Sequence, residues 1–120
     1  MRDPSPRAPF DQGLFLKHFN KGKAFYDEKR FEDPNFVYVT GPAAAFLVEK
    51  NLRLVGIDSL GIEKFGHKEH PAHHALLRRG VTIVEGLYLV DVPPGDYTFF
   101  CGPLRILGAE GAPARAFLTT

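Results

Sequence analysis

Histidines and one glutamate in the middle of the chain are the residues best suited to chemistry. Four of the five histidines lie close together: His67, His70, His73 and His74. Glu85 follows in the same stretch, HPAHHALLRRGVTIVEGL, residues 70–87. Neutral imidazole and carboxylate are ordinary ligands for zinc and manganese. On a helix, His70 precedes His73 and His74 by three and four positions, so these side chains can share a face. Three interpretations stay open: solvated residues at a helix end, a self-contained HxxHH metal site, or one histidine acting with Glu85.

The stretch from residue 70 to residue 87 reads as a short helix, a glycine stop and a buried strand. Pro71 suits the first helical turn, where its missing N–H is no loss. Gly80 is a natural end for that helix, and the β-branched run Val81–Val84 is typical of a strand. Glu85 comes directly after the strand, where burying a carboxylate is costly unless a cation neutralises it. A structural ion pair with a nearby arginine is the alternative; the candidates are Arg78, Arg79 and Arg105.

An earlier segment repeats the order of helix and strand. Thr40 is the expected N-cap of a helix over Ala43–Lys50, with an apolar face at Ala43, Phe46 and Leu47. Leu52–Ile57 is nearly all apolar, which predicts a strand buried on both faces. Helix followed by buried strand, found twice, predicts an α/β fold with a parallel or mixed sheet.

Asp58 and Ser59 follow the first of these strands. The carboxyl ends of strands in open α/β sheets face the ligand crevice, so this pair is a candidate binding position. A simple Asx or serine turn explains the same two residues, and the sequence favours that reading.

The two ends of the chain carry shorter signals. We expect an extended or disordered lead-in over residues 1–12 and a single α/β domain over 13–120, with a first strand at Leu14–Leu16. Towards the C-terminus, we expect a strand at Tyr97–Cys101, broken by Gly102 and Pro103 and resuming over Leu104–Leu107. A glycine-rich loop and a last strand at Ala116–Leu118 should follow.

Composition narrows the functional classes. With 120 residues the chain is one domain, and a net charge of +1 without a basic block argues against nucleic acid or an anionic membrane as a partner. The single cysteine, Cys101, excludes an internal disulfide or a cysteine-cluster metal site, and this usage favours a cytoplasmic location. No apolar run approaches the ~20 residues of a membrane span, and the first residues lack the apolar core of a signal peptide.

Several blocks, spread over a stretch of about two thirds of the chain, resemble a known family. They are GPAAAFLVEKNLRL (residues 41–54), VGIDSLGIE (55–63), HPAHHALLRRGVTIVEGL (70–87) and GPLRILGAEGAPARAF (102–117). In this order they are similar to the C-terminal half of the metal-dependent cyclase-like hydrolases, which include bacterial-type kynurenine formamidases and isatin hydrolases. The resemblance implies the swivelling β/β/α fold of that family, without its N-terminal strands.

The resemblance also implies a site. The family's helix histidine falls on His73 and its partner carboxylate on Glu85, as ligands of a divalent metal, zinc or manganese. The family's earlier HxGTHxDxPxH motif, which supplies further ligands and an acid–base histidine, has no counterpart here, since His18 is the only histidine before His67. The catalytic residues therefore stay unassigned. The implied activity is hydrolysis of a small-molecule amide or lactam by a truncated or split enzyme.

Two other functions stay open. The chain is alternatively a non-catalytic remnant that acts as a scaffold or oligomerisation domain, or a small-molecule-binding module that uses Asp58 and Ser59. Missing strands would leave an open sheet edge, which promotes self-association. We therefore expect a homo-oligomer or a complex with a complementing N-terminal chain.

Overall fold

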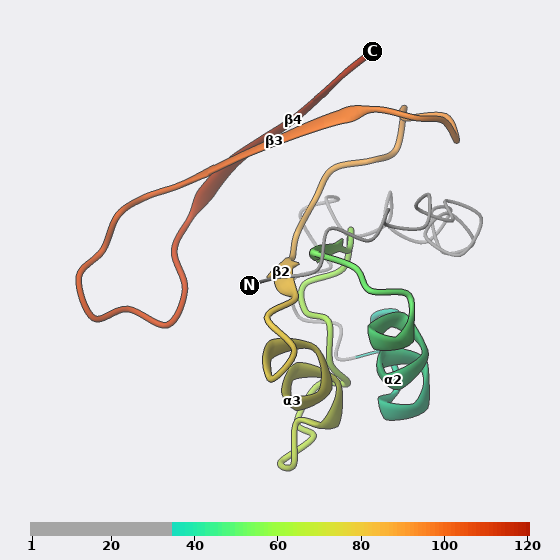
Figure 1. The fold of residues 1–120 in the computed structure, drawn as a ribbon, viewed down its shortest axis with the longest axis vertical. Coiled ribbons are helices and arrows are strands. Elements are labelled where there is room, and N and C mark those ends of the chain that lie inside the picture. Colours follow the sequence, from blue (N-terminus) through green and yellow to red (C-terminus); the bar gives the residue numbers. More distant parts are fainter. Residues whose placement is uncertain (1–34) are drawn as a thin grey trace, which may run out of the picture.

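The computed structural model describes residues 35–120; the expected lead-in and the strand expected at Leu14–Leu16 lie outside the described residues. Two helices and four strands make up this part of the chain (Figure 1). In chain order they are α2 (Gly41–Glu49), β1 (Leu54–Gly56), α3 (Pro71–Leu77), β2 (Thr82–Val84), β3 (Thr98–Pro103) and β4 (Ala114–Thr119). None of the described helices has the length and apolar character needed to cross a membrane.

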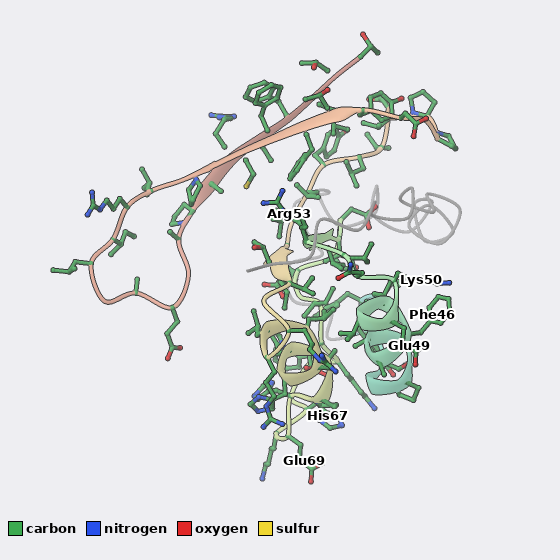
Figure 2. All side chains as sticks on the ribbon, in the orientation of Figure 1. Phe46, Glu49, Lys50, Arg53, His67 and Glu69 are labelled. Atoms are coloured by element: carbon green, nitrogen blue, oxygen red, sulfur yellow. The ribbon has the colours of Figure 1, made fainter. Side chains whose placement is uncertain are left out.

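Helix α2 begins as its sequence predicts. The Thr40 hydroxyl accepts a hydrogen bond from the Ala43 N–H (3.3 Å), which confirms Thr40 as the N-cap. The predicted apolar face is confirmed at Leu47, which packs against the core, and is wrong at Ala43 and Phe46; Ala44, rather than Ala43, is fully buried. Phe46 points away from α3 and lies 39% exposed, with the Lys50 ammonium 4.6 Å from the centre of its ring (Figure 2). Packing against α3 therefore places the buried face of α2 one position further along the sequence than predicted.

Strands β1 and β2 form a parallel pair linked by α3, so the predicted parallel βαβ order is confirmed. Each strand is shorter than expected, but hydrogen bonds continue beyond the pair: Leu87 N–H donates to the Ile57 carbonyl (3.1 Å) and Gly86 N–H to the Ser59 carbonyl (2.8 Å). These bonds hold the loop after β1 against the segment after β2. Glu85 therefore lies beside the loop that carries residues 58–63.

The core lies between the two helices and this small sheet. Its buried apolar members are Ala44, Val55, Ile62, Ala72, Leu76 and Val81. Ile62 belongs to a loop, yet it is as buried as Leu76 of α3. The loop between β1 and α3 is thus anchored in the core, which fixes the residues on either side of Ile62.

Strands β3 and β4 form a separate antiparallel ribbon that extends away from the helices (Figure 1). The expected break at Gly102 and Pro103 is wrong, because both pair with β4 as part of β3. Each strand of a two-stranded ribbon is an edge strand, and edges tolerate a proline that has no N–H to donate. The strand expected at Leu104–Leu107 is also wrong: this segment is a loop, closed by a hydrogen bond from Leu104 N–H to the Pro113 carbonyl (3.0 Å).

Candidate metal centre

Glu63 determines how α3 begins. His70 occupies the N-cap position with left-handed backbone angles (φ 44°, ψ 50°) and supplies no side-chain cap. The Glu63 carboxylate takes its place: Oε1 accepts a hydrogen bond from Ala72 N–H (3.1 Å) and Oε2 accepts one from His73 N–H (3.0 Å). The first N–H groups of a helix have no partner within the helix, and two of them here donate to a side chain from a distant loop.

The same carboxylate contacts the imidazole of His73. Oε2 of Glu63 lies 3.0 Å from His73 Nδ1. Burial of Glu63 raises the pKa of its carboxyl, but the hydrogen bonds from His73 and Ala72 and the nearby His73 side chain outweigh burial, and the pKa lies below its usual value. Glu63 is therefore an ionised carboxylate at neutral pH. An ionised carboxylate only accepts hydrogen bonds, so this contact is a hydrogen bond when Nδ1 of His73 carries the proton.

Glu85 approaches the opposite nitrogen of the same ring. Its Oε1 atom lies 3.5 Å from His73 Nε2 and accepts a hydrogen bond from Ile62 N–H (2.7 Å). Ile62 is anchored in the core, so this bond fixes the direction of the carboxylate. Among residues 35–120, no arginine forms an ion pair with Glu85, and the alternative of a structural pair with Arg78, Arg79 or Arg105 finds no support there.

The contact between His73 Nε2 and Glu85 is favourable when a donor or a cation satisfies both atoms. With the ring proton on Nδ1, Nε2 of the neutral imidazole presents a lone pair, and Glu85 Oε1 presents another. Two acceptors at 3.5 Å repel each other unless a shared proton, a water that donates to both, or a metal cation satisfies them. Imidazole nitrogen and carboxylate oxygen also form an ordinary donor set for a divalent metal. The residues present therefore fit a metal ligand pair.

Exposure leaves this pair accessible. The His73 and Glu85 side chains are 33% and 36% exposed, whereas Glu63 is 7% exposed. Further ligands from another segment can therefore approach these two side chains. Glu63, on the other side of the ring, is covered by the chain itself.

The other three histidines of this stretch lie in different surroundings in the structure. The ring of His70 lies edge-on to that of His73, with 5.8 Å between their centres, and donor atoms of Glu63, His70 and His73 all fall within 4.8 Å of one another. His74 lies on the side of α3 that faces α2, where it lines an open groove with Glu49. A self-contained HxxHH site is therefore not formed, because His74 points away from the other two. The buried Nδ1 atom of His67 has no hydrogen-bond partner among the described residues.

The structure thus brings together the two residues that the sequence singled out, His73 and Glu85, and adds a third. Glu63 was missed because it lies in a loop and its contacts reach residues nine and ten positions away. The only sequence signal was its place at the end of the VGIDSLGIE block. Asp58 and Ser59 are both buried in the described structure, which favours the turn over a ligand-binding position.

Comparison with known proteins identifies kynurenine formamidases among the relatives of this chain. No family model matches the chain. A kynurenine formamidase of Geobacillus thermodenitrificans is 43% identical over 81 residues, which are 68% of this chain and 39% of that protein. A kynurenine formamidase of Bacillus cereus is 40% identical over 106 residues, which are 88% of this chain and 48% of that protein. The chain thus spans less than half the length of these curated relatives.

Solved structures give the same picture. One described as a potential metal-dependent hydrolase with cyclase activity is 47% identical, with a TM-score of 0.65, over 69% of this chain and 41% of that one. Another, described as a predicted metal-dependent hydrolase from Bacillus stearothermophilus, is 45% identical, with a TM-score of 0.70, over 82% of this chain and 45% of that one. These similarities confirm the predicted fold class.

Proposed function

Since this chain belongs to the cyclase-like family of metal-dependent hydrolases, we propose that it supplies two ligands, His73 and Glu85, to the metal centre of an amide hydrolase. The observation that carries the proposal is the 3.5 Å approach of His73 Nε2 to Glu85 Oε1. The donor set of one imidazole and one carboxylate favours zinc or manganese.

Each residue of the chain has a distinct part in this function. His73 offers Nε2, and Glu85 offers an oxygen whose direction is held by the Ile62 N–H. When bound, the divalent metal supplies Lewis acidity, which polarises a carbonyl and lowers the pKa of water. The exposed side of His73 and Glu85 is where a small-molecule amide or lactam would meet the site. Formamidase relatives make an aryl formamide the first substrate class to test.

Two ligands hold a divalent cation weakly, because the remaining coordination falls to water. We propose that the other ligands come from a segment equivalent to the HxGTHxDxPxH motif of the family, on another chain or on a longer form of this one. A second copy of this chain would not supply those ligands, but it is a suitable partner for a homo-oligomer through the ribbon, where Phe100 and Phe117 stack at 4.8 Å and are about half exposed. We place this activity in the cytoplasm.

Zinc binding to the 120-residue chain tests the ligand assignment. Isothermal titration calorimetry with Zn²⁺ and with Mn²⁺ should show one site that is lost in His73→Ala and in Glu85→Ala. His74→Ala is the matched control, because this neighbour points towards α2 and should leave binding unchanged. Circular dichroism of each variant confirms that the chain is folded. Equal affinity in the wild type and in Glu85→Ala would refute the assignment.

Complementation distinguishes an enzyme from a non-catalytic remnant. The chain is mixed with the N-terminal half of the Geobacillus thermodenitrificans relative, which carries no counterpart of His73 and Glu85, and hydrolysis of an aryl formamide is followed. We expect metal-dependent turnover that requires Glu85. Stable complex formation without any turnover would instead identify the chain as a scaffold.

A further inference from the structure

Glu63 lies where it can decide which nitrogen of His73 meets a metal. Its carboxylate contacts Nδ1 at 3.0 Å, while Nε2 faces Glu85 on the other side of the ring. A neutral imidazole has one lone pair, so only one of its two nitrogens can bind a cation. The residue that holds the proton on one nitrogen thereby selects the other nitrogen as the ligand.

We propose that Glu63 is a positioning residue that locks His73 in the Nδ1–H tautomer and so commits Nε2 to the metal beside Glu85. This inference rests on the proposed function for its metal, but the tautomer is a property of the metal-free chain. A carboxylate that accepts a hydrogen bond from the ring N–H of a ligand histidine fixes the orientation of the ring and increases the basicity of the nitrogen that binds the metal.

Three features of the structure make Glu63 suited to this task. The carboxylate is itself immobilised, because it accepts hydrogen bonds from the backbone N–H groups of Ala72 and His73. It is buried, so water does not compete for Nδ1. It also belongs to the loop that contains Ile62, whose N–H holds Glu85. Adjacent residues of one loop therefore orient both proposed ligands, one through its side chain and the other through its backbone.

The same residues allow a second arrangement, in which a cation binds the other ring nitrogen of His73. Glu63, His70 and His73 each offer a donor atom within 4.8 Å of the others, so a cation could instead bind Nδ1 with His70. That arrangement would displace the proton to Nε2. Since Glu63 already accepts from two backbone N–H groups and Nδ1, the hydrogen-bonded arrangement leaves no donor without a partner, and we favour it.

The tautomer of His73 can be measured directly. Long-range ¹H–¹⁵N correlation spectra of the metal-free chain, recorded at a pH where the imidazole is neutral, distinguish the protonated from the unprotonated ring nitrogen. We expect the Nδ1–H form in the wild type and a mixture of the two forms in Glu63→Gln, whose amide cannot act as the ionised acceptor. The mainly Nε2–H form in the wild type would overturn the proposal.

Zinc titration of the same samples supplies the second measurement. Wild-type His73 should bind Zn²⁺ through Nε2, and Glu63→Gln should weaken binding by about 10- to 100-fold. His70→Ala should bind as tightly as the wild type; loss of binding there, with zinc on Nδ1, would overturn the proposal in favour of the competing site. Glu63→Asp, which keeps the charge, should recover part of the affinity.

A merely structural role for Glu63 makes a different prediction. Leu76→Ala removes a fully buried side chain of the same helix but no hydrogen bond to His73, and it should leave both the tautomer and the ligating nitrogen unchanged. If Leu76→Ala shifted the tautomer as Glu63→Gln does, the effect would come from loosening of α3 and the proposal would fail. If the tautomer of His73 changes in Glu63→Gln but neither the wild type nor any variant binds zinc, the proposed function fails while this inference stands.

Discussion

Replacing Glu63 by glutamine should lower the free energy of unfolding of the metal-free chain by about 2–4 kcal/mol. The carboxylate accepts three hydrogen bonds, from Ala72 N–H, His73 N–H and His73 Nδ1. The glutamine amide keeps one acceptor oxygen. Its NH₂ group, however, faces N–H donors whose hydrogen bonds the second carboxylate oxygen of Glu63 accepts in the wild type. Each hydrogen bond to a charged group contributes about 1.5–3 kcal/mol, and a covered N–H left without a partner costs about 1–3 kcal/mol.

Urea unfolding followed by circular dichroism, with EDTA present, measures this loss. An m-value of about 1.5 kcal/mol/M converts it into a fall of roughly 1.3–2.7 M in the midpoint. Glu69→Gln is the matched control, since Glu69 is an exposed glutamate at the tip of the same loop (Figure 2). If Glu63→Gln and Glu69→Gln unfolded within about 0.5 kcal/mol of each other, the capping role of Glu63 would be wrong.

The pH dependence of stability follows from the same contacts. The pKa of Glu63 in the folded chain lies below its ordinary value of 4.5, because hydrogen bonds from His73 and Ala72 outweigh the effect of burial. The contribution of the ionised group is therefore complete above pH 4.5 and is lost as the pH falls through the lowered pKa of the folded state. Unfolding free energies measured down to acid pH should fall less steeply in Glu63→Gln than in the wild type. Parallel curves would contradict this assignment.

Other substitutions test the fold around the site. Leu76→Ala should cost about 2–5 kcal/mol in urea unfolding, because Leu76 is fully buried, whereas Leu77→Ala at a 56% exposed position should cost less than about 1 kcal/mol. Thr40→Ala removes the N-cap of α2 and should cost about 1 kcal/mol; no loss would contradict the cap. Gly80→Ala should cost about 1 kcal/mol, because φ is 70° although no atom obstructs a Cβ, and Gly111→Ala is its control without a positive φ.

The amino-acid sequence by itself determined the two described helices and the order of helix and strand between residues 40 and 84. Thr40 specifies the start of α2, because its hydroxyl accepts a hydrogen bond from the N–H of the residue three positions later. Gly80, with a positive φ, ends the turn that follows α3. Both are local effects, which depend only on neighbours in the chain. The repeated order of helix and apolar strand likewise led to the parallel pairing of β1 with β2. His73 and Glu85 were identified by residue type and by resemblance, before any distance was known.

Only the tertiary structure decided what surrounds those two residues. Glu63 reaches His73 because the loop after β1 is anchored in the core through Ile62, and no local pattern contains that contact. Pairing with β4 likewise carried β3 through Gly102 and Pro103, where local propensity predicted a break. The physical reason is the same in both cases: a buried carboxylate and an edge strand are stabilised by partners that are distant in sequence, and the fold alone brings those partners within hydrogen-bond distance.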